Sequence, residues 1–426
     1  MRRRWKAWWI AALLMVPGTA RGAGYGLYEQ GGGALGASGA VAARVGDPTA
    51  IFFNPAGLAR VDEGTLYGGV SFLYATREFA GHGPYPGFGV HETSPDEVFY
   101  PVAAYWGHPL GDRVTVGFGF YSPFGLSVEW EDPETFSGRF ISTRVAITPF
   151  YFNPSVAFDV SPRLRIGGGV TAVHASVDLN RNVGQPNPTD FGPDVLDLGT
   201  VELDGSNGLD YGFNAGLQLD VTETAALGVT YRGGVETAID GDADFTFTGT
   251  GTGLDPQLGP LFPEDQGVTT EIPFPAQLVV GFAVEVSESV VLEADLGWTR
   301  WSDLDQLSLR FEDPDLDEVI PQHWEDAFFL RTGAEIALRP GTDLRFGYYY
   351  DETPQITESV SPLLPDNDRH GFSAGVGWAK GRWRFDVFGL LLLVQDRETE
   401  GVNRDGFEGV YDSGTQIAGL SLGFRY

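Results

Sequence analysis

Apolar and polar side chains alternate along most of the chain with a period of two. The clearest run spans residues 211–219, where apolar side chains occupy every second position and polar or small ones stand between them. Residues 292–299 and 344–350 follow the same pattern. Successive side chains of a β-strand point to opposite faces of the sheet, so the alternation predicts strands with one apolar face and one polar or small face.

Fourteen segments of this kind can be followed from Leu66 to the C-terminus. They span residues 66–77, 98–108, 113–122, 140–159, 163–180, 209–220, 224–237, 268–286, 289–300, 324–339, 342–352, 369–380, 383–395 and 412–426. Six connections are tight turns, at residues 110–112, 160–162, 221–223, 286–288, 339–341 and 380–381. The connections between these turns include long, acidic loops rich in Pro and Gly, such as residues 181–208, 240–267 and 302–323.

A closed antiparallel barrel in a membrane accounts for this arrangement. Short periplasmic turns and long external loops are typical of outer-membrane barrels. Closure follows from the solvent, because backbone amides in hydrocarbon must be hydrogen-bonded and an open sheet leaves an edge unpaired. After the first 22 residues, no run approaches the ~18 consecutive apolar residues of a membrane-spanning helix. The predicted fold class is an all-β membrane barrel, with fourteen antiparallel transmembrane strands in residues 65–426.

The first residues have the composition of a secretory signal peptide. Basic residues at positions 2, 3, 4 and 6 precede an apolar run over residues 7–16, and small residues follow up to Gly22. We therefore assign residues 1–22 to a signal peptide that is absent from the mature protein. Cleavage after Gly22 is favoured, and cleavage after Ala20 is the alternative.

Residues 23–64 lack any long alternating run and are rich in Gly and Ala. Asp47-Pro48 and Asn54-Pro55 each place a capping side chain directly before a proline, which predicts short helices that begin at Pro48 and Pro55. A barrel of fourteen strands leaves a lumen unless something fills it. We therefore predict that residues 23–64 form a small helical hatch that plugs the barrel.

Composition excludes several functions. The chain has 27 basic and 58 acidic residues and a net charge of −31, which excludes a nucleic-acid partner. It contains no cysteine, so disulfides, metal–thiolate sites and cysteine catalysis are excluded. We expect no cofactor and no metal site. The acidic loops are interpreted as solvated surface. The alternative is that divalent cations bridge their carboxylates to the anionic lipids of the outer membrane, such as lipopolysaccharide.

Several short motifs occur in the order and spacing of one known family. The most specific is Asn54-Pro55-Ala56, which is similar to the Asn-Pro-Ala motif in the hatch of the FadL family. The further matches are Phe124-Gly125-Leu126 with Glu129 and Trp130, Thr230-Tyr231-Arg232, Trp298-Thr299-Arg300-Trp301-Ser302, Asp351-Glu352-Thr353-Pro354 and Pro365-Asp366-Asn367-Asp368-Arg369. The chain from Ala23 to Tyr426 thus resembles these outer-membrane transporters of long-chain fatty acids, a family that also includes channels for aromatic hydrocarbons.

The resemblance implies uptake of a hydrophobic molecule across the outer membrane of a Gram-negative bacterium. The ligand is captured between extracellular loops, enters a pocket in the barrel and triggers rearrangement of the hatch. It then leaves sideways through an inward kink of the third strand, whose matching positions are Ser122, Pro123, Phe124 and Gly125. Proline cannot donate to the ladder and glycine permits unusual backbone angles, so strand pairing should fail here. The alternative is that the third strand ends and a loop begins.

Four residues are candidates for ligand binding. Arg181 falls where the family has an arginine implicated in ligand transport, and it could neutralise a carboxylate. The alternative is an ordinary rim arginine paired with a loop carboxylate. The family's second basic position falls near residue 320, but residues 311–330 contain no Lys or Arg, and His323 is the nearest substitute. This departure favours, modestly, a neutral ligand. Phe52 and Phe53 could meet the pocket floor or form the core of the hatch.

Other classes of function stay open at this point. A general diffusion porin would need an open lumen lined with charge, whereas this chain devotes about 40 residues to a predicted plug. An outer-membrane hydrolase would need a base held by other groups, but the histidines at 82, 91, 108, 174, 323 and 370 form no recognisable constellation. We expect no enzyme activity. The terminal Tyr426 resembles the signal read by the barrel assembly machinery. A monomer is expected, because sideways release needs lipid contact at the exit.

Overall fold

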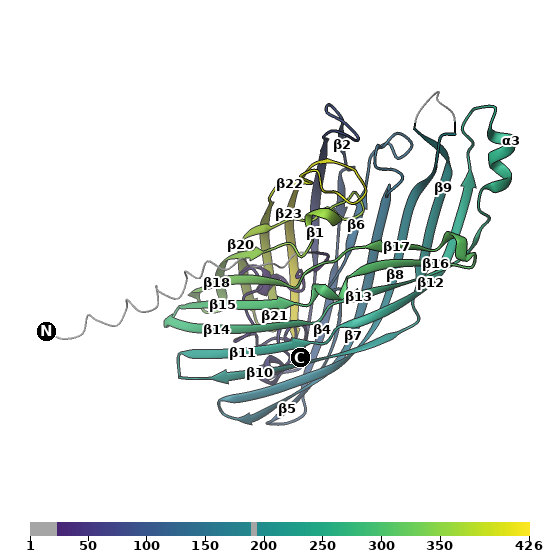
Figure 1. The fold of residues 1–426 in the computed structure, drawn as a ribbon. Coiled ribbons are helices and arrows are strands. Elements are labelled where there is room, and N and C mark those ends of the chain that lie inside the picture. The colour runs from purple at the N-terminus through teal and green to yellow at the C-terminus, as the bar shows by residue number, and fades with distance from the viewer. Residues whose placement is uncertain (1–23, 189–193) are drawn as a thin grey trace.

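The computed structural model describes residues 24–188 and 194–426, and the predicted signal peptide lies outside them. The wall is a closed barrel of fourteen antiparallel strands (Figure 1). Some wall strands are interrupted and carry two labels. In order they are β1 (Thr65–Gly81), β3 (Glu97–Phe99) with β4 (Val102–Pro109), β5 (Val114–Tyr121) with β6 (Leu126–Glu129), β7 (Arg144–Ser161), β8 (Leu164–Pro186), β9 (Val195–Ser206) with β10 (Asp210–Asp220), β11 (Ala225–Arg232) with β12 (Val235–Phe247), β13 (Gln266–Phe274) with β14 (Gln277–Ser287), β15 (Val290–Thr299), β18 (Ala327–Arg339), β19 (Thr342–Asp351), β20 (Arg369–Lys380), β21 (Trp383–Val394) and β23 (Gly409–Arg425).

Shorter elements lie in the connections at the loop end. They are β2 (His91–Thr93), α3 (Asp255–Leu258), η2 (Gly259–Leu261), η3 (Trp301–Asp303), β16 (Gln306–Phe311), η4 (Pro314–Leu316), β17 (Glu318–Pro321), η5 (Thr357–Ser359) and β22 (Arg397–Glu398). The β16–β17 hairpin is tied to the wall, because β16 pairs with the start of β13. In the part of the chain that the structure describes, no helix is long and apolar enough to cross a membrane.

The first and last strands close the barrel. β1 pairs with β23 over its whole length, from Thr65 opposite Arg425 to Gly81 opposite Gly409. The predicted fold class, strand number and strand order are confirmed, and the six tight turns lie where the sequence predicted them. Pairing of β1 with β23 leaves neither terminal strand with a free edge in the hydrocarbon.

The two faces of the wall differ as the alternation predicted. On β10, Tyr211 and Phe213 are exposed on the outside, whereas Asn214 and Gln218 are buried inside. On β15, Leu296 is exposed and its neighbour Asp295 is buried. The outward face therefore meets lipid, and the inward face is polar enough to hydrogen-bond to whatever fills the lumen.

The predicted long loops are partly wrong, because several strands continue beyond the alternating apolar segments. β8 runs to Pro186 and pairs with β9, and β12 runs to Phe247 and pairs with β9 and β13. Along β12 the outward positions Asp240, Asp242 and Asp244 are exposed. Charged outward positions indicate that this part of the wall stands in water and not in lipid, so the sequence reads as a loop although the backbone is extended. In Figure 1 these extensions rise towards α3.

The N-terminal segment contains α1 (Gly32–Leu35), α2 (Ala50–Phe53) and η1 (Pro55–Arg60). The helix predicted at Pro55 is confirmed: Asn54 caps η1, its Oδ1 accepting a hydrogen bond from the Ala56 amide at 3.2 Å. The first predicted helix begins at Ala50, two residues later than predicted. Asp47 caps the turn that leads into it, because its carboxylate accepts from the Thr49 amide at 2.8 Å, and residues 48 and 49 form this turn.

Residues of this segment contact inward-facing positions on strands around the barrel. The Gly32 amide donates to Ser421 Oγ on β23 at 2.9 Å, and the Ala42 amide donates to Asp295 Oδ2 on β15 at 3.0 Å. η1 packs against β7, β8 and β10. Two wall glycines allow the closest approaches: a Cβ on Gly216 would lie 2.0 Å from Asn54 Oδ1, and one on Gly228 would lie 2.2 Å from the Ala42 carbonyl oxygen. The N-terminal segment is thus seated directly on the wall.

Candidate functional site

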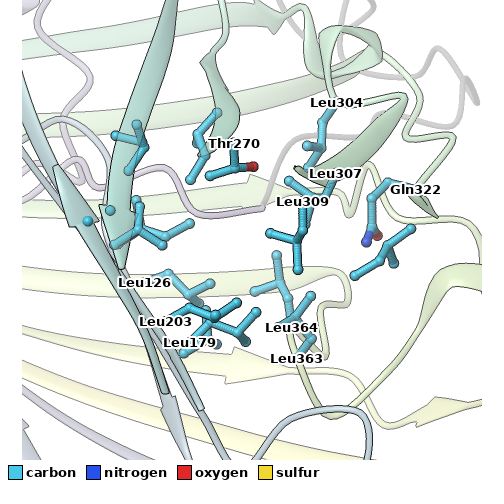
Figure 2. A pocket seen from close by; sticks show the side chains of 18 of the residues that line it. Leu126, Leu179, Leu203, Thr270, Leu304, Leu307, Leu309, Gln322, Leu363 and Leu364 are labelled. Atoms are coloured by element: carbon cyan, nitrogen blue, oxygen red, sulfur yellow. The ribbon is translucent and has the colours of Figure 1, made fainter. Parts of the chain in front are cut away.

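A cavity lies in the loop-side half of the barrel (Figure 2). Its empty volume is about 950 Å³, including the part open to solvent. Residues of β6 to β9, β12 and β13 form part of its wall. The β16–β17 region, residues 361–364 and Tyr25 of the N-terminal segment supply the rest. Figure 2 labels the principal lining residues, which are Leu126, Leu179, Leu203, Thr270, Leu304, Leu307, Leu309, Gln322, Leu363 and Leu364.

The chemistry of this cavity suits an apolar ligand. Most lining residues are aliphatic, and the polar ones are mainly uncharged hydroxyls and an amide. Asp204 is the one charged residue among the described lining residues, and none of them is basic. Moving apolar surface from water into such a site releases about 25 cal/mol per Å². The cavity can therefore hold hydrocarbon, but its own lining provides no cation for a carboxylate.

An aromatic group lies at one side of the cavity. Tyr25 and Trp324 line it, and Trp301 packs between them with ring centroids 4.7 Å and 5.3 Å away. Burial raises the pKa of the Tyr25 hydroxyl far above its ordinary value, with the negative charge of Asp303 adding to the shift. The hydroxyl therefore stays protonated and donates to the Pro273 carbonyl.

Next to Tyr25 the third wall strand is interrupted. β5 ends at Tyr121 and β6 begins at Leu126. The N-terminal segment takes the place of a neighbouring strand here: the Leu27 amide donates to the Pro123 carbonyl and the Gly125 amide donates to the Tyr25 carbonyl, both at 2.8 Å. The Phe124 side chain is fully buried. The backbone at residues 123–125 is therefore turned towards the lumen.

The interruption leaves a stretch of the wall without a ladder on one side. β4 and β5 pair as far as Ala104 opposite Phe120, and β6 pairs only with β7. In residues 24–188, nothing joins β3–β4 to β5–β6 as a ladder beyond Phe120. Further out, the Glu131 amide donates to the Thr93 carbonyl at 2.9 Å and bounds this stretch.

The interruption comes from one extra residue. Four residues, 122–125, separate Tyr121 from Leu126, but only three, 148–150, separate their partners Tyr151 and Ile147 on β7. An odd spacing would normally put Tyr121 and Leu126 on opposite faces. Both face inward, since Tyr121 is buried and Leu126 lines the cavity. The extra residue acts as a bulge that turns the backbone.

Two predicted ligand residues lie near the cavity but outside its lining. Arg181 follows Leu179 on the inward face of β8 and forms a two-bond ion pair with Glu318 on β17, with N–O distances of 3.2 and 2.5 Å. The arrangement thus matches the alternative that Arg181 is paired with a loop carboxylate. His323 is exposed, has a positive φ and contacts Asp305 at 2.7 Å.

Phe52 and Phe53 are buried in the aromatic core between the N-terminal segment and the wall, and neither lines the cavity. Their rings lie 4.8 Å apart, and both pack on Tyr28. The Asn54-Pro55-Ala56 motif is fully buried beneath them. Its Asn54 amide donates to the Ala42 carbonyl at 2.8 Å and to the Leu217 carbonyl at 3.0 Å. The motif therefore connects one part of the segment to another and to β10.

Sequence reasoning missed most of the cavity lining. Leu304, Leu307, Leu309, Leu363 and Leu364 lie in connections that read as acidic loops. In the sequence they stand out only as leucines within otherwise charged or turn-forming stretches. A large apolar side chain is unusual in a loop that lies in water, so these leucines could have indicated buried positions. Alternation cannot reveal such residues, because they come from short hairpins and turns.

Comparison with known proteins identifies the family. Residues 13–406 match the model of the outer membrane protein transport protein family (OMPP1/FadL/TodX). This chain belongs to that family. The resemblance predicted from the motifs is confirmed, and so is the location in the outer membrane of a Gram-negative bacterium. As a member of the OMPP1/FadL/TodX family, the protein is an outer-membrane transporter of hydrophobic substrates.

Individual family members are distant from this chain in sequence. A 47 kDa outer membrane protein of Pasteurella multocida is 25% identical, with 86% of each chain covered. A long-chain fatty acid transport protein of Escherichia coli is 21% identical over 86% of each chain. The crystal structure of a FadL homologue from Pseudomonas aeruginosa matches with a TM-score of 0.84 and 20% identity, covering 95% of this chain and 100% of the other. The toluene transporter TbuX of Ralstonia pickettii gives a TM-score of 0.68 and 19% identity, covering 93% and 98%.

Proposed function

We propose that this protein takes up long-chain fatty acids or similar hydrophobic molecules from outside the cell and releases them sideways into the outer membrane. The observation that carries the proposal is the aliphatic cavity beside the interrupted third strand. Tyr25 connects the cavity with the interruption. It lines the cavity, and its backbone carbonyl accepts a hydrogen bond from the Gly125 amide. Neutral aromatic hydrocarbons are the second candidate class, because the described cavity lining contains no basic residue.

The route follows from the cost of wetting hydrocarbon. Each exposed methylene of an acyl chain costs ~0.8 kcal/mol, so a dry path between apolar walls is favoured over a water-filled pore. The ligand is captured between the extracellular loops and enters the cavity. Movement of the N-terminal segment then frees residues 122–125, and the ligand passes into lipid through the unpaired stretch beyond Phe120, between β3–β4 and the interrupted third strand.

Residues 23–64 are the hatch in this proposal. Their backbone occupies the pairing positions of the interrupted strand at Tyr25 and Leu27. Displacing residues 25–27 would therefore release Pro123 and Gly125 together. We also propose that the protein acts as a monomer, because a subunit docked on β3–β6 would cover the exit.

The first test is uptake in cells that lack their own transporter. Radiolabelled oleate and a labelled neutral aromatic hydrocarbon are supplied with and without this protein. Faster uptake of either probe supports the proposal and selects the substrate class. Uptake of neither probe, together with a steady ion conductance in planar bilayers, would instead identify a diffusion porin.

A carboxylate placed in the cavity should block both substrate classes. In Leu203→Asp the new charge faces aliphatic side chains next to Asp204. Burying an unpaired charge there is costly, so uptake of both probes should fall by about tenfold or more. The matched control is Val195→Asp, on the same strand but half-exposed and outside the lining. Initial rates are compared at equal amounts of folded barrel, and equal loss in both variants would contradict the assignment of the cavity.

Arg181 gives a test of substrate charge. Arg181→Ala should lower oleate uptake by about tenfold, the value of one charge-assisted hydrogen bond, and leave hydrocarbon uptake unchanged. Glu318→Gln serves as the control, because it removes the same ion pair but keeps the cation. If both variants transport oleate normally, the pair is only a surface contact at the rim.

A further inference from the structure

Arg232 is a buried arginine in the lumen without an acidic partner among the described residues. Three described arginines expose less than a tenth of their surface: Arg232, Arg331 and Arg345. Arg331 pairs with Asp351 at 3.2 Å, and Arg345 contacts three carboxylates, Glu335 and Asp386 at 2.7 Å and Asp343. Arg232 forms no ion pair with any residue that the structure describes.

The contacts of Arg232 are all neutral. Its Nη1 donates to Gln277 Oε1 at 3.0 Å, and its Nη2 donates to the Phe52 carbonyl at 2.9 Å. The guanidinium lies over the Phe52 ring, 4.3 Å from the centroid. Its Nε is buried and has no hydrogen-bond partner. A buried guanidinium with a free donor and no counter-ion is poorly compensated.

The position of Arg232 connects the hatch to the exit. Phe52 belongs to α2 of the hatch, and the Tyr121 ring, 6.0 Å from the guanidinium, belongs to the last residue before the interruption. Tyr121 stacks on Tyr151, which contacts Phe124. The cation therefore lies behind α2, and aromatic rings lead from it to the unpaired stretch of the wall.

We propose that Arg232 is a binding site for the carboxylate of an amphipathic substrate, occupied when α2 moves away and before the substrate leaves through the third strand. The site rests on the proposed function and, between its two substrate classes, favours the long-chain monocarboxylates. Withdrawal of α2 removes the Phe52 carbonyl and ring from one face of the guanidinium. The planar guanidinium then offers parallel N–H groups to a carboxylate, the geometry of its strongest hydrogen bonds.

This site complements the chemistry of the cavity. The cavity accepts the hydrocarbon part of the substrate but contains no cation among its described lining residues. Arg181, the basic side chain beside it, is already paired with Glu318. A carboxylate that passes the hatch therefore meets a buried cation at Arg232 that has no ion pair with any described residue.

The test compares two probes that differ only at one end, labelled hexadecanoate and labelled hexadecanol. In cells without their own transporter, Arg232→Gln should lower hexadecanoate uptake by about tenfold and change hexadecanol uptake by less than about twofold, because only the carboxylate loses a charge-assisted hydrogen bond. Arg232→Lys, which keeps the charge, should restore part of the hexadecanoate rate. Heat-modifiable migration on gels measures the amount of folded barrel for each variant.

A matched control comes from Arg331, which also holds the hatch by donating to the Ser38 carbonyl and lying over the Tyr28 ring. The double variant Arg331→Gln/Asp351→Asn removes that arginine with its counter-ion and should affect both probes equally. An equal loss of both probes in Arg232→Gln would overturn the proposal and leave Arg232 as a hatch contact. If Arg232→Gln does not fold, Arg232→Lys decides: an equal loss of both probes overturns the proposal, and a selective loss of hexadecanoate supports it.

The unmutated protein separates the two proposals. Uptake of hexadecanol but not of hexadecanoate overturns the carboxylate site and leaves the proposed function intact. Uptake of neither probe overturns the carboxylate site, and the proposed function is overturned with it only if the aromatic hydrocarbon of the first test is not taken up either. Uptake of both probes by the unmutated protein, with selective loss of hexadecanoate in Arg232→Gln, supports the site.

Discussion

Deletion of Pro123 should abolish uptake of every hydrophobic substrate while the barrel still assembles. After the deletion, three residues would remain between Tyr121 and Leu126, which equals the three residues between their partners on β7. The spacing would then be even, so both side chains could face inward without a bulge. β5 and β6 could then form one continuous strand and pair with β4, which would close the proposed exit. We expect uptake of oleate and of a neutral hydrocarbon to fall to the background of cells without the protein.

The control for this deletion is Pro123→Ala. It restores the missing amide hydrogen but keeps four residues against three, so the bulge and most of the uptake should remain. Folded barrel is measured by gel migration and surface labelling. Full uptake by the deletion variant would show that the substrate does not leave at the third strand.

Gly216→Val should unseat the hatch and lower uptake by about tenfold. A Cβ at this position would lie 2.0 Å from Asn54 Oδ1 and 2.9 Å from Pro55 Cδ, so the motif must move off β10. Asn54 would lose its bonds to the Ala42 and Leu217 carbonyls, and leaving such buried groups unpaired costs about 1–3 kcal/mol each. Limited proteolysis of folded protein should then cut within residues 24–64, which are otherwise protected.

Gly389→Val is the matched control, because this strand glycine has open space where its Cβ would lie. Asn54→Ala removes the same hydrogen bonds without a clash and weakens the cap of η1 by ~1 kcal/mol, so it should reduce uptake less than Gly216→Val. Normal uptake by Gly216→Val, despite cleavage in the hatch, would contradict the role assigned to this segment.

The membrane part of the fold could be predicted because lipid imposes a simple rule on the outward face. Tyr211 and Phe213 alternate with small or polar residues because one face meets hydrocarbon. The outward face need not be apolar where the wall stands in water. The sequence therefore predicts a loop in the part of β12 where Asp240 and Asp242 take the place of apolar residues. α1 escaped prediction for another reason: its sequence Gly-Gly-Ala-Leu has weak helix propensity, and contacts with the distant Ser421 hold it in place.

The candidate site was harder to predict than the barrel. The motif at residues 54–56 and the interruption at residues 122–125 have local signals, a capping residue before proline and a proline within a strand. Arg232 has none: it was noted only as part of a matching motif, and its lack of a counter-ion appears only when the lumen is assembled. The pairing of Arg181 with Glu318 is equally invisible, since 137 residues separate the two.

The contacts of the N-terminal segment fix the order in which the protein is completed. The hydrogen bond from Gly32 to Ser421 joins residues 389 positions apart, and it requires β23, the last strand of the wall, to be in place. Contacts across such sequence distances form late, because loop-closure entropy must be overcome first. We therefore expect the N-terminal segment to be fixed only when the last strand is present, so a chain truncated before β23 should leave this segment open to protease.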